Sequence, residues 1–251
     1  MSRFNIADEF FPELEHFGHW EIFKGIERPW DVLAKIEDYL LATFPAKKAN
    51  GLPSGIKQMK GADEFLICTA PVVLKKDLVF KPLKIVIGAG TKIEPTALIK
   101  GPTIIGKNCD IRHGAYLRGG LLCGDTCTLG HTTEIKNSVI MNHSEMGHFN
   151  YIGDCVIGSY VNLGAGTKLA NLKFRAAAAK MKVSFPEISF LLDGKKVKTG
   201  RSKLGAVIGD HCELGCNSVT SPAVLLGHEC WVMPNMTVTS GYYKPKTFLR
   251  P

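Results

Sequence analysis

The sequence predicts an all-β solenoid of hexapeptide repeats, preceded by a helical segment and interrupted by one inserted loop. The main observation is an apolar residue at every sixth position: Ile87, Ile93, Ile99, Ile105, Ile111, Leu117, Cys123, Leu129, Ile135 and Met141. The period returns at Ile152, Ile157, Leu163 and Leu169, and again from Ile208 to Val238. A period of six fits neither a helix nor two-residue alternation. It indicates a triangular coil of three hexapeptides, about 18 residues per turn.

A second observation is a small residue two places before most of these apolar positions. Five of the eight cysteines occupy it: Cys109, Cys127, Cys155, Cys212 and Cys230. Both side chains must fit the narrow interior of the coil, and free cysteine behaves as a small buried hydrophobe. We therefore interpret these cysteines as packing residues in a reducing cytosol, rather than as disulfides or zinc ligands.

Residues 1–82 lack the repeat and predict a helical lead-in to the solenoid. Apolar and aromatic residues recur there at helical spacing, at Trp30, Leu33, Ile36, Tyr39 and Leu40. Asp31 lies near the expected start of this helix, and Pro45 follows its end. We interpret the segment as a helical cap that packs against a neighbouring element.

The repeat domain is expected over 83–241, with a C-terminal tail over 242–251 and an insertion over 172–203. A long excursion from a regular repeat costs little closure entropy and is typically functional. Because its end is basic (GKKVKTGRSK), the insertion is expected to be a lid or wall for an anionic ligand. A surface loop without a role is the alternative.

Composition excludes several classes of protein. Hydrophobic residues make up 45% and charged residues 22%, which excludes extensive disorder. No apolar run reaches the roughly 18 residues of a membrane helix, and the N-terminus lacks a signal-like apolar region. We expect a cytoplasmic protein. The net charge of +8 favours anionic small ligands over nucleic acid, because no nucleic-acid-binding motif accompanies it.

Polar residues interrupt the pattern between 133 and 172. They are Glu134, Lys136, His148, Asn150, Tyr151, Asp154, Asn162 and Asn171. Flat solenoid strands need none of these side chains for stability. The repeat skips at the hexapeptide MGHFNY, so His148 is expected to project outward.

The runs EIKNS, GHFNYIGD, IGSYVNLGAGT and TGRSKLGAVIGD resemble a known family over roughly residues 83–240. The chain resembles the left-handed β-helix acetyltransferases, in particular the C-terminal domain of the bifunctional N-acetylglucosamine-1-phosphate uridyltransferase/glucosamine-1-phosphate acetyltransferases. The archaeal sugar-1-phosphate nucleotidylyltransferase type is the most similar. The resemblance implies a left-handed parallel β-helix and a homotrimer with active sites between subunits. It also implies acetyl-CoA-dependent N-acetylation of an amino-sugar phosphate without a metal, in nucleotide-sugar biosynthesis.

The resemblance also implies roles for individual residues. His148 matches the general base and Glu134 its acidic partner. The residues matching phosphate contacts are Arg118, Lys136 and Lys203. Those matching sugar contacts are Tyr151, Asn162 and Asn171. Those matching acetyl-CoA contacts are Ala165, Cys216 and Pro234, of which Cys216 replaces a serine and Pro234 an alanine.

These residue types suit acyl transfer. An unprotonated amine must attack a thioester, and a neutral imidazole, with an ordinary pKa of about 6.5, accepts the amine proton at pH 7. Glu134 either orients that imidazole or attracts the ammonium form of the substrate. A backbone N–H in the turn Gly164–Ala165–Gly166 is a candidate donor to the oxyanion. The tail cations Lys244, Lys246 and Arg250 either meet coenzyme A phosphates or only solvate the C-terminus.

Some features depart from the family. The 82 residues before the repeat are too few for a nucleotidyltransferase domain and contain no GxGTR-like loop, so we expect no uridylyl transfer. His131 stands where the family commonly has Asn, and Leu172 where bacterial enzymes have Tyr. These differences leave the identity of the amino sugar open, together with the acyl group of the donor.

Two other functions compete with this interpretation. A γ-class carbonic anhydrase would share the solenoid and bind zinc through three histidines, for which His113, His143 and His148 are the candidates. A catalytically inactive solenoid would bind a sugar nucleotide or regulate a partner enzyme. Retention of Glu134, Lys136, His148 and Tyr151 argues against the inactive solenoid, because a scaffold needs no base.

Overall fold

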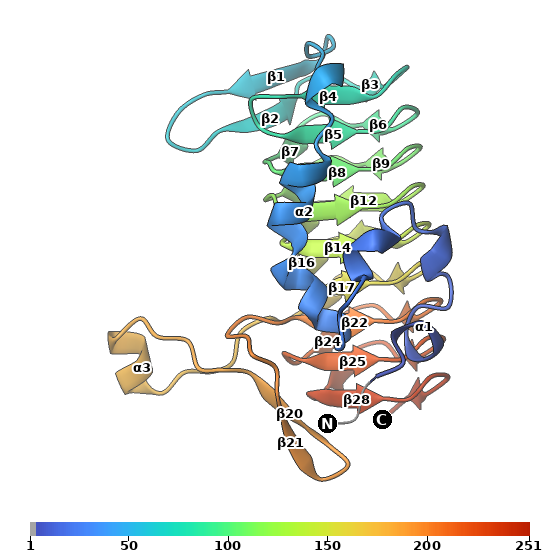
Figure 1. Ribbon diagram of the computed structural model, residues 1–251, viewed down its shortest axis with the longest axis vertical. Coiled ribbons are helices and arrows are strands. Elements are labelled where there is room, and N and C mark those ends of the chain that lie inside the picture. Colours follow the sequence, from blue (N-terminus) through green and yellow to red (C-terminus); the bar gives the residue numbers. More distant parts are fainter. Residues whose placement is uncertain (1–3) are drawn as a thin grey trace.

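A computed structural model describes residues 4–251 as a tall β-solenoid whose three faces are three sheets of nine strands each (Figure 1). Sheet A contains β1 (Ile56–Met59), β2 (Phe65–Cys68), β7 (Leu98–Ile99), β10 (Tyr116–Leu117), β13 (Glu134–Lys136), β16 (Tyr151–Gly153), β19 (Lys168–Leu169), β24 (Val219–Thr220) and β27 (Thr237–Val238). Sheet B contains β3 (Val72–Val73), β6 (Lys92–Ile93), β9 (Asp110–Ile111), β12 (Thr128–His131), β15 (Glu145–His148), β18 (Asn162–Leu163), β23 (Glu213–Leu214), β26 (Trp231–Val232) and β29 (Phe248–Leu249). Sheet C contains β4 (Leu78–Phe80), β5 (Ile85–Ile87), β8 (Thr103–Ile105), β11 (Leu121–Cys123), β14 (Ser138–Ile140), β17 (Val156–Ile157), β22 (Ala206–Ile208), β25 (Val224–Leu226) and β28 (Gly241–Tyr243). The predicted all-β solenoid is confirmed.

The interior follows the repeat with one correction. All ten predicted apolar positions from Ile87 to Met141 are buried, and so are the five cysteines at the small position. Met141, however, lies in a second hydrophobic cluster, on the outer side of sheet C, whereas Ile140 lies in the core inside the solenoid. Ile140 pairs with Cys123 one coil above, so this coil is one residue shorter than the regular repeat.

The same register shows where the repeat skips. Met146 pairs with Leu129, and Ile152 with Ile135, so the spacing around His148 is a normal six residues. The skip predicted at His148 instead lies at the corner between sheets A and C, next to Asn137. His148 is nevertheless exposed, as expected.

The strands begin earlier than the repeat does. Residues 56–80, which the sequence places in the lead-in, form β1 to β4. Of these, β2, β3 and β4 pair antiparallel with β7, β6 and β5, the first parallel strands of the three sheets. These antiparallel strands pair with the backbone N–H and C=O groups of the first parallel strands, which would otherwise form open sheet edges at this end of the solenoid.

Residues 4–48 lie along the side of the solenoid rather than over its end (Figure 1). Their helices are α1 (Ile6–Glu9), η1 (Leu14–His16), η2 (Trp20–Phe23), η3 (Pro29–Ala34), α2 (Ile36–Thr43) and η4 (Ala46–Lys48), where η marks a 3-10 helix. The predicted helix is therefore divided between η3 and α2. Its residues Trp30, Leu33, Ile36 and Leu40 are buried, in one cluster with Leu122, Val156 and Leu225 from the outer side of sheet C. The segment thus covers sheet C and leaves sheets A and B uncovered.

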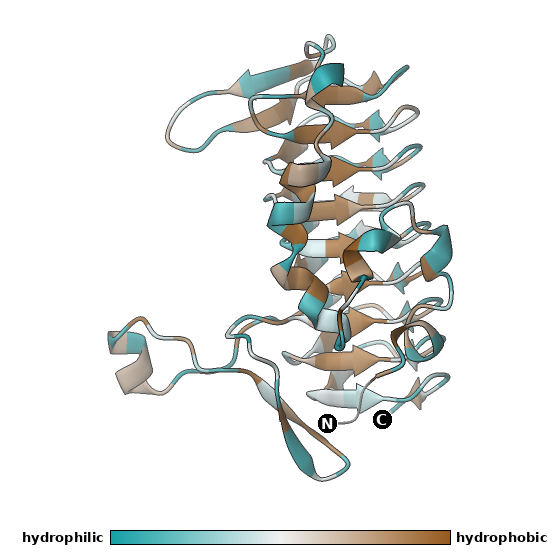
Figure 2. Ribbon diagram, viewed as in Figure 1, coloured by the Kyte–Doolittle hydropathy of each residue, from teal (hydrophilic) through white to brown (hydrophobic). Residues whose placement is uncertain are grey.

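The insertion extends away from the solenoid (Figures 1 and 2). It contains α3 (Ala177–Met181) and a hairpin of β20 (Ser189–Leu192) and β21 (Lys195–Lys198). Residues 172–203 carry nine lysine and arginine residues against two acidic ones, so they account for seven of the eight net positive charges. Within residues 4–251, no helix has the length and apolar character that crossing a membrane requires.

Asp210 attaches the N-terminal segment to the solenoid. Its carboxylate accepts hydrogen bonds from the backbone N–H of Glu13 at 2.7 Å and of Ser159 at 2.6 Å. Burial raises the pKa of Asp210 to about 6, more than its two backbone hydrogen bonds and nearby His211 lower it.

This shift predicts a pH-dependent stability. A carboxyl whose folded pKa is raised favours the folded state when protonated, so its contribution decreases as pH rises from about 4 to about 6. We expect the difference in unfolding free energy between wild type and Asp210→Asn to fall by about 2 kcal/mol over that interval. Chemical denaturation at a series of pH values measures it. A difference that is constant with pH would contradict the expectation.

Candidate active site

The predicted polar residues of sheet A come from the outer side of consecutive coils. Tyr116, Glu134 and Tyr151 are in register on β10, β13 and β16, so their side chains lie one above another. Arg118 donates to the Glu134 carboxylate from Nη1 to Oε1 at 2.6 Å, and its guanidinium lies over the Tyr116 ring. Glu134 and Arg118 therefore form an ion pair on the surface of sheet A.

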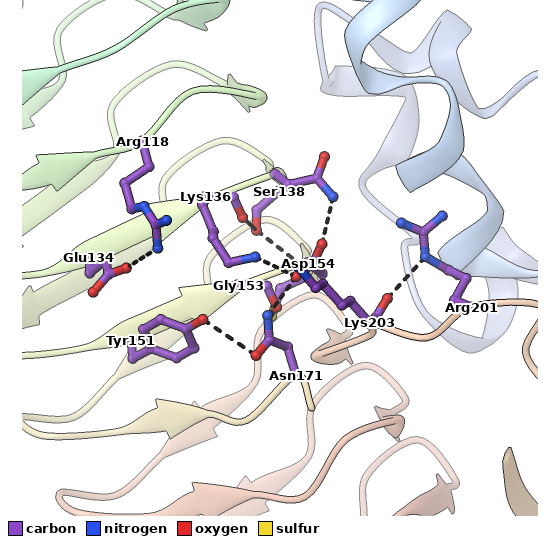
Figure 3. Close-up of polar contacts among 12 residues, drawn as sticks. Arg118, Glu134, Lys136, Ser138, Tyr151, Gly153, Asp154, Asn171, Arg201 and Lys203 are labelled. Carbon is purple, nitrogen blue, oxygen red and sulfur yellow. Dashed lines mark hydrogen bonds and ion pairs between the residues drawn. The ribbon is translucent and has the colours of Figure 1, made fainter. Parts of the chain in front are cut away.

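Asp154 is the centre of the polar cluster (Figure 3). Its carboxylate accepts hydrogen bonds from Lys136 Nζ at 2.8 Å, Asn137 Nδ2 at 2.7 Å and Asn171 Nδ2 at 2.6 Å. Burial raises the pKa of Asp154, but the hydrogen bonds from Lys136, Asn137 and Asn171 outweigh burial and lower it overall. A carboxylate that stays ionised thus connects Lys136, from one coil, to Asn171, two coils below.

The side chains of Tyr151 and Asn171 contact each other next to Gly153. Tyr151 donates from its hydroxyl to Asn171 Oδ1 at 3.4 Å. A Cβ atom at Gly153 would lie 2.7 Å from the Tyr151 hydroxyl and 2.9 Å from Asn171 Nδ2. The absence of a side chain at Gly153 therefore leaves the space in which these two predicted sugar contacts approach each other.

A methyl group at this position tests that arrangement. We expect Gly153→Ala to displace Tyr151 and Asn171 and to raise the KM for the acceptor at least about tenfold. The loss of unfolding free energy should stay within about 1–3 kcal/mol, since only side-chain ends are contacted. Steady-state kinetics and denaturation of Gly153→Ala beside Gly51→Ala, at an exposed position where an added Cβ atom meets nothing within 4 Å, provide the measurement and its control. An unchanged KM would contradict the assigned role of Gly153.

Lys203 lies where the insertion returns to the solenoid. The next residue, Leu204, donates from its backbone N–H to the Asn171 carbonyl at 3.1 Å, so the return of the insertion borders the cluster. Arg201 donates from Nε to the Lys203 carbonyl at 3.2 Å (Figure 3). Burial lowers the pKa of Arg201, and the carboxylates of Asp154 and Asp31 counteract this. The end of the insertion therefore adds one cation, Arg201, that interacts electrostatically with Asp154.

His148 lies at the corner between sheets B and A. Backbone hydrogen bonds run down this corner from coil to coil: Phe149 N–H to the His131 carbonyl, Gly166 N–H to that of His148, and Asn217 N–H to that of Ala165. His148, Ala165 and Cys216 thus occupy equivalent positions in successive coils and form one column. Pro234 occupies the next position of this column, because the following residue, Asn235, donates from its backbone N–H to the Cys216 carbonyl. The His148 ring is exposed and contacts Phe149, at 6.0 Å between ring centroids.

The turn below His148 offers a free amide. Gly164 N–H donates to the Leu214 carbonyl and Gly166 N–H to the His148 carbonyl, at 2.7 and 2.9 Å. Within residues 4–251 the Ala165 N–H has no acceptor, so it is available to a ligand beside His148. An unpaired, partly exposed amide of this kind can stabilise a developing oxyanion.

Other predicted groupings do not form within one chain. Asn162 lies on sheet B and donates to Glu213 Oε2 at 2.8 Å, on a different face from Tyr151 and Asn171. In the described part of the chain, no hydrogen bond or ion pair joins Glu134 to His148; Glu134 is paired with Arg118 instead.

The predicted zinc ligands do not converge either. His143 stacks on Tyr160 at 4.7 Å, whereas His113 stacks on His131 at 5.3 Å, on the His148 column. Over residues 4–251, no three histidine, cysteine, aspartate or glutamate side chains are grouped to hold a metal ion.

No function was assigned from the sequence to three residues in or next to the polar cluster: Asn137, Gly153 and Arg201. Asp154 was recognised only as one polar residue among several. The available signal was the spacing, because Lys136 and Asn171 lie 18 and 17 residues from Asp154, which is one coil on either side. Residues one coil apart are neighbours in a solenoid.

Known proteins show similarity to the repeat region. Residues 84–119 match the family model of the bacterial transferase hexapeptide (six repeats). A bifunctional sugar-1-phosphate nucleotidylyltransferase/acetyltransferase of Sulfurisphaera tokodaii is 40% identical over 107 residues, which are 43% of this chain and 24% of that protein. The bifunctional protein GlmU of Methanocaldococcus jannaschii is 33% identical over 101 residues, 40% of this chain and 22% of that protein. The chain therefore spans about a quarter of the length of these relatives.

Among solved structures, a mutant of perosamine N-acetyltransferase from Caulobacter crescentus, in complex with CoA and GDP-perosamine, is 15% identical with a TM-score of 0.34. The match covers 63% of this chain and 50% of that one. The resemblance seen in the sequence motifs is confirmed by the curated relatives. The chain contains the bacterial transferase hexapeptide repeat and, through less than half of its length, is related to the bifunctional sugar-1-phosphate nucleotidylyltransferase/acetyltransferases.

Proposed function

We propose that the protein is an acetyl-CoA-dependent N-acetyltransferase of an amino-sugar phosphate, of the glucosamine-1-phosphate type, in nucleotide-sugar biosynthesis. The observation that carries the proposal is the polar cluster around Asp154 on sheet A, next to a corner that presents an exposed His148 above a free Ala165 amide. The names of the curated relatives support the same chemistry.

The reaction uses few groups of this chain. His148 removes a proton from the attacking amine as the new C–N bond forms at the thioester carbonyl. The Ala165 N–H stabilises the resulting oxyanion. Collapse of this intermediate breaks the C–S bond, and the thiolate of coenzyme A takes the proton from His148. Cys216 and Pro234, next along the same column, are the proposed contacts to acetyl-CoA.

The cations of sheet A are proposed to hold the acceptor phosphate. Arg118 and Lys136 are each positioned by a carboxylate, Glu134 and Asp154, at 2.6 and 2.8 Å. A phosphate completes such a pair by charge-assisted hydrogen bonds to the remaining N–H groups. Lys203 contributes a cation whose Nζ lies over the Phe185 ring, 5.5 Å from its centroid.

A homotrimer is proposed as the active form. Sheet C is covered by the N-terminal segment, so sheets A and B are the two open faces. A cyclic assembly joins two different faces of neighbouring copies. Joining sheet A of one copy to sheet B of the next would bring Asn162 toward a neighbouring Tyr151 and Asn171, which one chain keeps apart.

Product analysis tests the function. Purified protein is incubated with acetyl-CoA and a panel of amino-sugar 1-phosphates, 6-phosphates and nucleotide-linked amino sugars, and acetylated product is detected by mass spectrometry. We expect turnover of an amino-sugar phosphate. A folded protein that binds acetyl-CoA but acetylates none of the panel would require another acceptor class. Absence of both turnover and acetyl-CoA binding would favour the inactive sugar-nucleotide-binding solenoid.

A further inference from the structure

A cavity outside the polar cluster lies between the N-terminal segment and the hairpin of the insertion. It has a volume of about 890 Å³. One wall comes from residues 25–35 and the other from Leu192 to Lys198, and Phe4 also lines the cavity. This volume lies within the range of about 300–1,000 Å³ found for small-molecule sites.

The cavity is preformed because its two walls are bonded to each other. Trp30 donates from Nε1 to the Thr199 carbonyl at 3.1 Å, and its ring packs on Phe190 at 5.7 Å between centroids. Arg28 donates from Nη1 to the Lys198 carbonyl at 3.3 Å. The hairpin is thereby held at a defined position on the N-terminal segment.

The residues that line the cavity form an apolar floor and a basic rim. Phe4, Ile26, Leu192 and Val197 are half-buried side chains that pack against the cluster outside sheet C. The exposed lysines of the lining are Lys195, Lys196 and Lys198. In the described residues their ammonium groups have no hydrogen bond or ion pair, whereas Arg28 is already paired with Asp31 at 2.7 Å. Glu27, Asp31 and Asp193 are the acidic residues of the same lining.

We propose that this cavity binds a nucleoside phosphate. The flat face of the base lies against the apolar floor. The phosphate groups meet Lys195, which shares a face of β21 with Val197, and Lys196 and Lys198 on the opposite face add positive charge. Three ammonium groups on one short strand create a local excess of positive charge that attracts an anion carrying more than one negative charge. An inorganic phosphate would use the rim alone, and an uncharged apolar ligand the floor alone. Only a ligand with both parts uses the whole cavity.

The position of the cavity suggests where such a nucleotide comes from. Arg201, three residues beyond Lys198, interacts electrostatically with both Asp31 of the cavity wall and Asp154 of the polar cluster. A carboxylate of the cavity wall and a carboxylate of the cluster thus both act on the same arginine. The nucleotide is either part of a substrate that also reaches the cluster, such as a nucleotide-linked amino sugar or coenzyme A, or a separate molecule.

Direct binding measurements test the proposal and need no catalytic activity, so their outcome is independent of acetyl transfer. Isothermal titration is carried out with UDP, ADP and inorganic phosphate, at low and high salt. We expect at least one nucleotide to bind more tightly than phosphate, and its affinity to fall with salt. Lys195→Glu should weaken nucleotide binding about tenfold, and the triple variant Lys195→Glu/Lys196→Glu/Lys198→Glu about a hundredfold.

Two further variants complete the design. Lys107→Glu makes the same charge change at an exposed position on the solenoid, and it should leave the affinity within about twofold. Ile26→Trp fills the floor without changing charge, and it should abolish nucleotide binding while weak phosphate binding remains. The proposal is overturned if no nucleotide binds the folded wild type, or if binding is unaffected by both the lysine variants and Ile26→Trp.

Competition then distinguishes the sources of the nucleotide. A sugar nucleotide that competes with UDP and loses affinity in both Lys195→Glu and Tyr151→Phe spans cavity and cluster. Coenzyme A that competes and loses affinity in Lys195→Glu identifies the donor as the source. Nucleotide binding that neither substrate displaces identifies a separate site.

Discussion

The variant His148→Ala is expected to retain the fold and to lose acetyl transfer by a factor of about 10²–10⁴. The side chain is exposed, and no hydrogen bond joins it to the residues that the structure describes; the backbone N–H donates to Asn150 Oδ1 and the backbone carbonyl accepts from Gly166 N–H. Removal of the ring therefore removes a proton acceptor without opening a cavity. The loss should appear in kcat rather than in KM, since a general base acts in the transition state.

The control for this prediction is His143→Ala. His143 is also exposed, but it lies at a different corner, stacked on Tyr160, and should leave the rate unchanged within about twofold. Circular dichroism and thermal unfolding of both variants establish that they fold. Acetyl transfer at the wild-type rate in His148→Ala would exclude this histidine as the base.

The second large effect is expected from Asp154→Ala. The change leaves Lys136, Asn137 and Asn171 without their common acceptor, in a region where the Asp154 side chain is only 5% exposed. Removing one partner of a buried ion pair typically costs about 3–5 kcal/mol, because the other charge stays buried without compensation. We expect a loss of this size in unfolding free energy, together with loss of acceptor binding.

Two further variants distinguish the loss of the ion pair from a general loss of stability. Asp38→Ala, on the exposed side of α2, should change stability by less than about 0.5 kcal/mol. Asp154→Asn keeps the shape but removes the charge. Its destabilisation relative to wild type should begin to decrease as pH falls below about 3.9 and should be lost once pH passes below the lowered pKa of Asp154, because such a carboxyl stabilises only while it is ionised. A pH-independent difference would contradict the ion-pair role of Asp154.

The solenoid interior could be predicted because its periodicity is local. Each coil contacts mainly the coils above and below it, so a residue from Ile87 onward has the same surroundings as its equivalent one coil later. The prediction was wrong at Met141, because the corner next to Asn137 is one residue shorter than the repeat and places Ile140 in the core. A shortened corner leaves the apolar pattern almost unchanged, since both residues are apolar and both are buried.

The sequence predicted most residues of the candidate site but not the contacts between them. The polar residues between 133 and 172 were recognised. Glu134, Lys136 and Tyr151 do lie on sheet A, and Arg118 and Asn171 lie just beyond its strands β10 and β19. Their partners depend on which side chains meet across coils. In the structure Glu134 pairs with Arg118 rather than with His148, and Lys136 pairs with Asp154. The spacing of residues does not determine such choices, because several partners lie within reach of each long side chain.

The sequence by itself determined the solenoid and the buried cysteines, since both follow from a repeated short-range pattern. It predicted the exposure of His148 from a skip in the repeat that the structure places at another corner. Only the tertiary structure decided the path of residues 4–48 along sheet C, the antiparallel strands from Ile56, and the cavity against the hairpin. Those features depend on contacts between distant residues, such as Glu13 with Asp210 and Trp30 with Thr199. The physical reason is that non-periodic segments gain their stability from packing against a surface that exists only after the coils have stacked.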